Sequence, residues 1–388
     1  MINKKYNVTA QILTPLSIGQ GAEKDWVYGI DYLTKEDEYG NLWLYHLDLN
    51  KMVTAGVDVN KMAQTFAGGN PGAVNLLVGP KLEKVSDCKM RLPVSSVEVE
   101  KALSNPIKTF LRNQLTNRPV LAGSSLKGAL RSILFSYLVG DEEDKKRLRQ
   151  ELKFAQGNIN LNIRYFGDMT KGTDFMRFIR VGDFEFEKTG LVNTKIFNLH
   201  RVGQEWEGGW KHSKDKTTCD FSPIGFNTIY ECLLPNATAG GYIMFADTLF
   251  DKIQQSPDKK ADILHSDVAT LCDIVNNHTL DYLDREFNFF ETYPADNSQR
   301  IINSMTNIYN ECIRLTEEEP HSCILKMSAG SGFHSITGDW QYDDYTETGI
   351  YECGKNAGKK KYKSRKIAVS GSKPFSLMGF IKLTFDKI

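Results

Sequence analysis

Residues 123–131, GSSLKGALR, combine two glycines, two serines, a lysine and an arginine at the start of an apolar helical pattern. Side chains of these types can bind phosphate. A nucleotide-hydrolysing P-loop has the order Gly-x-x-x-x-Gly-Lys-Ser/Thr, because its lysine reaches the terminal phosphates and its hydroxyl binds magnesium. Here Lys127 precedes Gly128, and Ala129 stands where the hydroxyl is needed. The sequence therefore argues against nucleotide hydrolysis at this segment.

The same segment still predicts a helix start that can hold an anion. We expect Ser124 or Ser125 to cap the helix, so that the first-turn N–H groups and the positive end of the helix dipole face outward. Lys127 and Arg131 are four residues apart and share one face, away from the apolar stripe. Two interpretations stay open: a phosphate-binding site, and a capped helix with two solvated basic side chains.

Other side chains that could take part in catalysis or bind a metal lack a partner at useful spacing. His46, His200 and His334 could each act as a general base, but the sequence shows no arrangement that would orient them. Asp25, beside Trp26, is a candidate metal-binding carboxylate, although a solvated loop aspartate is the simpler interpretation. The seven cysteines are scattered without a CxxC pair, so neither a disulfide framework nor a zinc site is expected. We predict no metal and no cofactor.

The charge of the chain is balanced, with 48 basic and 48 acidic residues in 388. A free-standing nucleic-acid-binding protein is usually basic overall, so this average does not favour that class. Residues 354–366 are strongly basic and follow the acidic stretch 339–352. This basic run is either a solvated loop or a hairpin that touches phosphates. No apolar run is long enough to span a bilayer and no signal core is visible, so we expect a cytoplasmic protein.

Periodicity predicts mixed strands and helices, which indicates an α+β fold. Strands are expected where apolar residues alternate, and helices where they recur every three or four residues. The stretch 97–115 is expected to form a helix interrupted near Pro106, and residues 204–220 a polar loop. The expected strands are 6–12, 176–186 with an irregularity near Gly182, 228–235, 241–250 and 379–385, and the expected helices begin at 124, after Asp262 and at 298.

Five segments in their order along the chain resemble the RAMP proteins of type III CRISPR systems. They are LTPLSIGQG (13–21), LAGSSLKGALRSILFSYL (121–138), RFIRVGDFEF (177–186), LKMSAGSGFHSITG (325–338) and KPFSLMGFIKL (373–383). Their order and spacing are most similar to the family of the fifth Csm protein, the terminal subunit of type III-A (Csm) effector complexes. The helix-start segment is shared by several RAMP subfamilies, so this finer assignment depends on the first segment and the two C-terminal ones.

The resemblance implies two ferredoxin-like, RRM-related RAMP domains with insertions. We place them at 1–190, with an inserted segment at about 50–118, and at 191–388. It further implies a non-catalytic subunit that binds the 3′ part of the CRISPR RNA and caps that side of a Csm complex. The implied partners are CRISPR RNA, the backbone and small Csm subunits, and host nucleases recruited for maturation of the RNA 3′ end, with no membrane.

The resemblance also selects residues for RNA contact. Since the aromatic signature of a base-reading RRM is absent, we expect contacts to the RNA backbone. The predicted RNA-contact residues are Gly19, Gly21, Gly123, Ser124, Ser125, Lys127, Arg131, Arg177, Arg180, Gly330, Ser331, Gly332 and Lys373. Two alternatives remain: a metal-independent endoribonuclease that cuts CRISPR repeats with His334 as general base, and a RAMP subunit of a Cmr-type complex.

Overall fold

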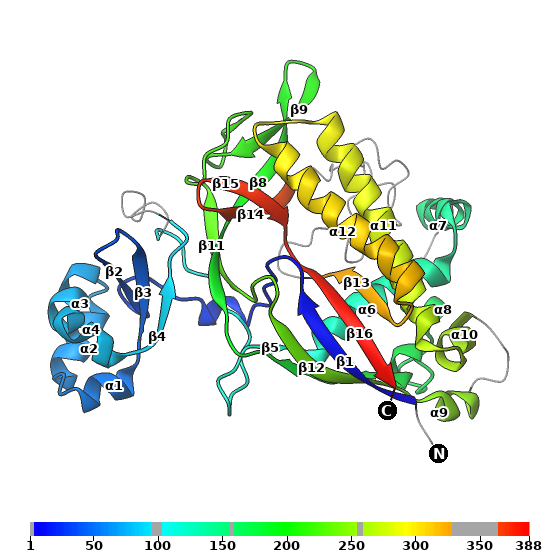
Figure 1. Cartoon of the computed structure of the whole chain (residues 1–388), viewed down its shortest axis with the longest axis horizontal. Coiled ribbons are helices and arrows are strands. Elements are labelled where there is room, and N and C mark those ends of the chain that lie inside the picture. Colours follow the sequence, from blue (N-terminus) through cyan, green and yellow to red (C-terminus); the bar gives the residue numbers. More distant parts are fainter. Residues whose placement is uncertain (1–3, 95–102, 155–158, 254–258, 328–363, 388) are drawn as a thin grey trace.

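The computed structural model describes residues 4–94, 103–154, 159–253, 259–327 and 364–387. Two antiparallel sheets form the body, and a smaller lobe lies to one side (Figure 1). The first sheet has the order β13-β16-β1-β12-β6, with β1 (Lys4–Ile12), β6 (Ile179–Val181), β12 (Thr238–Phe245), β13 (Ser322–Lys326) and β16 (Phe380–Lys387). Strands from the two ends of the chain, β1 and β16, are therefore paired at the centre of this sheet.

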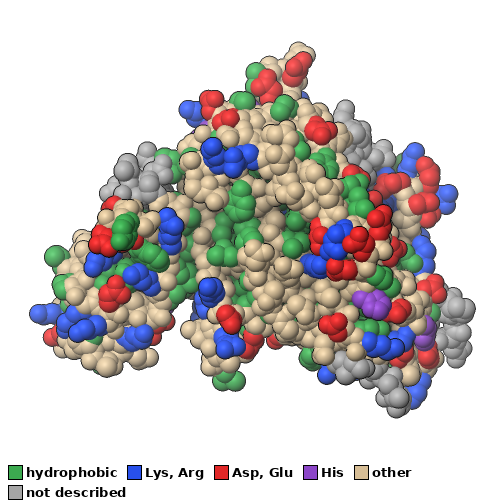
Figure 2. Space-filling model, in the orientation of Figure 1, with side chains coloured by type: hydrophobic (Ala, Val, Ile, Leu, Met, Phe, Trp, Pro, Cys, Tyr) green, Lys and Arg blue, Asp and Glu red, His purple; other side chains and the backbone are tan. Residues whose placement is uncertain are grey.

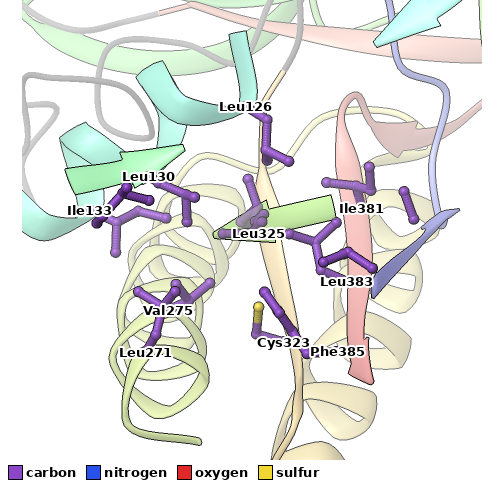
Figure 3. Close-up of a cluster of buried hydrophobic side chains, with 14 of the residues drawn as sticks. Leu126, Leu130, Ile133, Leu271, Val275, Cys323, Leu325, Ile381, Leu383 and Phe385 are labelled. Carbon is purple, nitrogen blue, oxygen red and sulfur yellow. The ribbon is translucent and has the colours of Figure 1, made fainter. Parts of the chain in front are cut away.

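Alternation in β1 buries every second residue from Tyr6 to Ile12 and gives this sheet an apolar face. The helices α6 (Gly123–Val139) and α11 (Val268–Thr292) contribute to the same core. Figure 3 shows Leu130 of α6, Val275 of α11 and Leu325 of β13 within one buried cluster. This packing holds the first turn of α6 at the edge of the sheet, beside β6.

The second sheet is built on the long strand β8 (Gly190–Val202). Its order is β10-β9-β8-β14-β15, and β11 also pairs with β8. The other strands are β9 (Glu205–Lys211), β10 (Thr217–Thr218), β11 (Asn227–Cys232), β14 (Ser364–Ser370) and β15 (Lys373–Leu377). A second core joins this sheet to the C-terminal half of α11 and to α12 (Ser298–Glu318). The helix α11 therefore contributes to the cores of both sheets.

The lobe on the left of Figure 1 contains a three-stranded sheet, β2-β3-β4, and four short helices. Asp48, Asp58 and Asn70 cap three of these helices by accepting hydrogen bonds from first-turn N–H groups. One core joins the sheet to the helices, and another extends from it toward β8 and β11. The elements are β2 (Tyr32–Glu36), β3 (Leu42–Leu47), α1 (Leu49–Thr54), α2 (Val59–Ala67), α3 (Pro71–Val78), α4 (Leu82–Val85) and β4 (Ser86–Arg91).

Short elements connect these parts. In a small ladder, β5 (Val120–Leu121) pairs with β7 (Phe184–Glu185) directly before α6. The remaining elements are η1 (Ala22–Lys24), η2 (Gly79–Lys81), α7 (Glu142–Phe154), α8 (Leu161–Phe166), η4 (Phe175–Phe178), α9 (Asp247–Asp251) and α10 (Lys259–His265). Among the described helices, none is both long and apolar enough to cross a membrane.

Several expected elements are confirmed and others are corrected. The strand 6–12, the helix from 124 and the helix from 298 are present as β1, α6 and α12. The strand expected at 176–186 is divided at Gly182 into β6 and β7, which belong to different sheets. Residues 103–115 contain no helix, and the polar stretch 204–220 forms β9 and β10 instead of a loop.

Mixed helix and sheet is confirmed, and the two expected domains share one sheet. Strand β1 of the expected first domain pairs with β12 and β16 of the expected second domain. The lobe occupies part of the expected insertion at about 50–118 but already starts with β2. The boundary at 190/191 stays a prediction.

Candidate nucleic-acid interface

The helix α6 starts in close contact with β6, and this contact explains its first glycine. A Cβ atom on Gly123 would lie 2.3 Å from the carbonyl oxygen of Val181 and 2.6 Å from that of Gly182. The backbone N–H of Gly123 donates a hydrogen bond to Oδ1 of Asp183 at 2.7 Å. The N-cap is Ala122, without a side-chain cap, so the predicted cap by Ser124 or Ser125 is wrong. A carboxylate of the chain itself already occupies the positive end of this helix.

The exposed face of α6 begins one residue later. Ser124, Lys127, Gly128 and Arg131 are spaced by three or four residues, so they share one side of the helix. Ser124 and Gly128 are exposed, and a Cβ atom on Gly128 would meet nothing within 4 Å. Glycine inside a helix costs about 1 kcal/mol relative to alanine. Unlike Gly123, Gly128 has no packing reason for its missing side chain.

Arg131 is held by three contacts within the body. Its guanidinium forms an ion pair with Asp174 at 3.5 Å, donates to Oδ1 of Asn162 at 3.0 Å and lies 3.9 Å from the centre of the Phe166 ring. Asp174 is buried and also accepts a hydrogen bond from the N–H of Met176 at 2.9 Å. Arg131 therefore ties α6 to α8 and η4 as well as contributing positive charge.

Lys127 and Arg180 add two further cations to this part of the surface. Burial lowers the pKa of Lys127; the carboxylate of Asp174 opposes this effect, and the charges of Arg131 and Arg180 lower that pKa further. Arg180 is exposed on β6. Neither Lys127 nor Arg180 has an ion-pair partner among the described residues. Three cations stand against two carboxylates here, the buried Asp174 and Asp183 at the helix start, and an anion can neutralise this local surplus of positive charge.

The other predicted contact residues lie at varying distance from this cluster. Arg177 is exposed, donates to the carbonyl oxygen of Gly172 and has its guanidinium 5.7 Å from the centre of the Phe178 ring. Gly19 is exposed and pairs with Phe110 in an isolated bridge. Gly21 has φ 110°, a conformation that favours glycine.

A ladder of main-chain hydrogen bonds links the loop of Gly19 and Gly21 to the start of α6. The N–H of Leu111 donates to the carbonyl oxygen of Ile18, and the N–H of Val120 donates to that of Leu111. Val120 belongs to β5, directly before α6. The loop and the helix start are thus positioned by the same short ladder.

Lys373 belongs to a different part of the body. It is exposed at the start of β15, after a turn in which Gly371 has φ 57°. Gly330, Ser331, Gly332 and His334 lie outside the described residues, as does most of the basic run 354–366. Contact of any of the predicted residues with RNA stays a prediction.

Two of the side chains considered as catalytic or metal-binding groups, Asp25 and His46, have structural partners, whereas the buried Nδ1 of His200 has no hydrogen-bond partner among the described residues. Asp25 is paired with the ammonium of Lys108 and accepts from the N–H of Thr109. The ring of His46 is bonded to Oδ1 of Asp87 at 2.6 Å and packs on Trp26, with ring centres 4.6 Å apart. The described part of the chain contains no cluster of three or more metal-ligating side chains.

Sequence reasoning missed the two aspartates that organise the site. Asp174 and Asp183 lie more than 40 residues from Arg131 and Gly123, respectively, and no short-range pattern joins them. The segment 177–186, singled out by its alternation, is the one signal that pointed to this region. It contains Asp183 and the strand against which α6 packs.

A comparison of the sequence with models of protein families identifies the family of this chain. The sequence model of the RAMP superfamily matches residues 9–255. The chain belongs to the RAMP superfamily, as the five segments predicted. No curated protein matches the sequence.

Two solved structures share the fold over nearly the whole chain. One is a chain of a Csm–crRNA–target RNA ternary complex of a type III-A CRISPR-Cas system, solved by cryo-EM. It is 16% identical, with a TM-score of 0.61, and the match covers 99% of this chain and 100% of that chain. The other is Csm5 of T. onnurineus, 15% identical, with a TM-score of 0.55 and coverage of 96% and 99%. At these identities the likeness concerns the fold.

Proposed function

We propose that this protein is an RNA-binding subunit of a type III-A (Csm) effector complex. In this role it holds CRISPR RNA, caps the side of the complex at the RNA 3′ end and contacts the backbone and small Csm subunits. The two structural neighbours, one within a complex that contains crRNA, support this subtype over a Cmr-type complex. Support of 3′-end maturation through recruited host nucleases belongs to the same proposal.

One observation carries the RNA-binding part of the proposal. Lys127 lies near Arg131, Arg180 and the carboxylate of Asp174, and the helix face between Lys127 and Arg131 is opened by Gly128. RNA phosphates bind to such surplus cations, and a missing side chain lets a sugar–phosphate backbone approach closely. The face reads no bases, which suits a subunit that must hold RNA of any sequence.

The topology of the first sheet supports a ferredoxin-like N-terminal unit. Along the chain, β1, α6, β6, β12, α11 and β16 occupy the positions of a βαββαβ unit, and their strand order is β16-β1-β12-β6. We therefore propose that the first RAMP domain is completed by the C-terminal strand β16. The second domain of the proposal is centred on β8, β14 and α12.

We propose a structural role for this subunit, without a catalytic step. Asp25 is paired with Lys108, so its charge is already balanced within the chain. The endoribonuclease alternative depends on His334, which lies outside the described residues. Incubating the purified chain with repeat RNA in EDTA separates the two: single-site cleavage that His334→Ala abolishes would establish the enzyme.

The RNA-binding face is tested by removing the two cations that have no ion-pair partner. We expect Lys127→Ala with Arg180→Ala to weaken retention of the guide RNA in the reconstituted complex, because the phosphate-binding surplus is lost. The matched control is Lys146→Ala with Arg147→Ala, which removes two exposed charges from α7. Equal retention by the two double variants would refute the site. Arg131 is left in place because it also holds α6 to the body.

A further inference from the structure

A groove of about 1100 Å³ lies between the lobe and the second sheet. On the lobe side it is lined by the consecutive residues 89–94, which include the end of β4. On the body side it is lined by residues 188–192, at the start of β8, and by the turn 369–372 between β14 and β15. Figure 2 shows hydrophobic side chains along the junction of lobe and body, with Lys and Arg side chains on the lobe beside it.

Two unpaired strand edges border this groove. Among the described strands, β4 pairs only with β3. The segment 190–192 of β8 pairs with β11 on one side, and pairing with β14 on the other side starts only at Asn193. Main-chain N–H groups at such edges can donate hydrogen bonds to an extended ligand. The groove therefore fits a linear polymer better than a compact small molecule.

The charge of the groove indicates the sign of its ligand. Of the 23 described residues that line it, three are basic, Lys89, Arg91 and Lys188, and none is acidic. The whole chain, by contrast, has 48 residues of each sign. Lys89 is already paired with Glu83 at 3.5 Å. Among the described residues, the guanidinium of Arg91 donates to the amide oxygen of Asn41, at 2.7 Å, and has no ion-pair partner, and Lys188 is exposed.

The apolar part of the lining suits nucleotides. The half-buried ring of Phe375 lines the groove together with the basic residues, while Met90 and Leu92 in the same lining are buried. Single-stranded RNA is held by cations that follow its phosphates and by apolar or aromatic surfaces that pack against its bases and sugars. An acidic peptide could pair with the strand edges, but it would leave the combination of basic side chains with an aromatic ring unexplained.

We propose that this groove binds a second, single-stranded segment of the RNA that the α6 face holds. The inference rests on the proposed function and extends it to a separate site. Arg91 and Lys188 neutralise phosphates, and Phe375 packs against a base or sugar. Pro15 lines the groove, and Gly19 and Gly21 follow in the same loop. This loop leads from the groove to the ladder at the start of α6, so one strand of RNA can pass along both sites.

The test compares short and long uridine oligonucleotides on the purified full-length chain. The groove variant is Arg91→Gln with Lys188→Gln, and its control is Lys61→Gln with Lys84→Gln, two exposed lysines of the lobe outside the groove lining. Each phosphate contact to a single strand contributes about 0.7 to the slope of log K against log salt concentration. The groove variant should therefore lower the slope for long RNA by about 1.4 and leave the slope for short RNA unchanged.

The α6 variant, Lys127→Ala with Arg180→Ala, separates failure of this inference from failure of the proposed function. It should weaken both lengths of RNA. If this variant changes the binding of neither RNA length while the groove variant weakens binding of the long RNA, the groove is supported as an RNA site and the α6 site is refuted. If the groove variant behaves as its control, the groove is not an RNA site. Thermal unfolding midpoints equal to that of the wild type show that each variant is folded.

Crosslinking identifies the occupant directly. Long RNA that contains 4-thiouridine should crosslink to residues of the groove, Phe375 among them, in the reconstituted complex. Replacement of Phe375 by leucine should remove that crosslink and retain those to α6. Crosslinks from the groove to a protein subunit, with none to RNA, would overturn the proposal in favour of a peptide partner.

Discussion

The two glycines of GSSLKGALR should respond oppositely to the same substitution. A Cβ atom on Gly123 would lie 2.3 Å from a main-chain oxygen of Val181, far inside van der Waals contact. Since the obstacle is backbone, either β6 or α6 must shift, and such overpacking costs about 1–3 kcal/mol. Gly128→Ala meets nothing within 4 Å and replaces glycine within a helix, which stabilises by about 1 kcal/mol. The two variants should thus differ by about 2–4 kcal/mol in free energy of unfolding.

Urea unfolding, followed by circular dichroism and by tryptophan fluorescence, measures this difference. Gly123→Ala should lower the midpoint and Gly128→Ala should raise it, with the same slope against urea. A neutral Gly123→Ala would refute the explanation by close approach to β6. A Gly128→Ala variant that is less stable than the wild type would refute the conclusion that a side chain at this position meets no neighbour.

The same pair separates stability from function. If RNA passes close to the α6 face, side chains at Gly128 should weaken RNA binding in the order Ala, then Gln, although both variants are more stable than the wild type. Gly128→Gln with unchanged guide-RNA retention would refute close approach of the RNA backbone at this residue. The opposed effects on stability and binding make the result independent of any general loss of folding.

Two further predictions concern buried charge. Burial lowers the pKa of Lys326 to about 7, so between pH 7 and about 10.4 the unfolded chain holds a proton that the folded chain has released. Stability should therefore rise with pH in that window by up to about 1.4 kcal/mol per unit, and Lys326→Met should flatten the rise in urea titrations at pH 7, 8 and 9. Arg131→Lys keeps the charge but loses the fixed geometry with Asp174, Asn162 and Phe166. It should lower the free energy of unfolding by about 1 kcal/mol and leave the salt dependence of RNA binding unchanged; a large loss of RNA affinity would contradict its role as a tie.

Periodicity predicted the elements that bury one face against a large core. Strand β1 alternates in burial, and α6 and α12 carry apolar stripes, so the local pattern and the fold agree. The helices of the lobe were not predicted, because they are short and three of them depend on a capping Asp or Asn and on neighbours brought together by the fold. Such helices have too few residues for a periodic signal.

The hairpin β9–β10 was not predicted from the sequence, for a different reason. Its Gly208 and Gly209 predicted a loop, since glycine weakens strands. In the structure, a Cβ atom on Gly208 would lie 2.1 Å from the carbonyl oxygen of Tyr293, and one on Gly209 would lie 2.7 Å from that of Thr218. These glycines permit close approach of neighbouring backbones, which a single sequence does not reveal.

The site shows the same division between local and distant information. The spacing of Lys127 and Arg131 was sufficient to predict one basic helix face. It did not show that Arg131 is committed to Asp174, or that Arg180 of β6 joins the face, because both relations depend on the packing of α6 against the first sheet. Likewise, the helix end that the sequence offered to an anion is filled by Asp183.

The distribution of charge, and not its sum, therefore determines how a neutral chain can hold RNA. Acidic side chains balance the basic ones over the molecule, yet none lines the described groove, and at α6 two carboxylates, Asp174 and Asp183, stand against three cations. A polyanion is attracted to such local surpluses over about one Debye length, roughly 8 Å at physiological salt, and is repelled elsewhere. In the proposed function the loop 15–21 joins these two separated surpluses and defines the path of a bound strand. Binding of long RNA should accordingly be more sensitive to salt than binding of short RNA, because the long strand neutralises both surpluses at once.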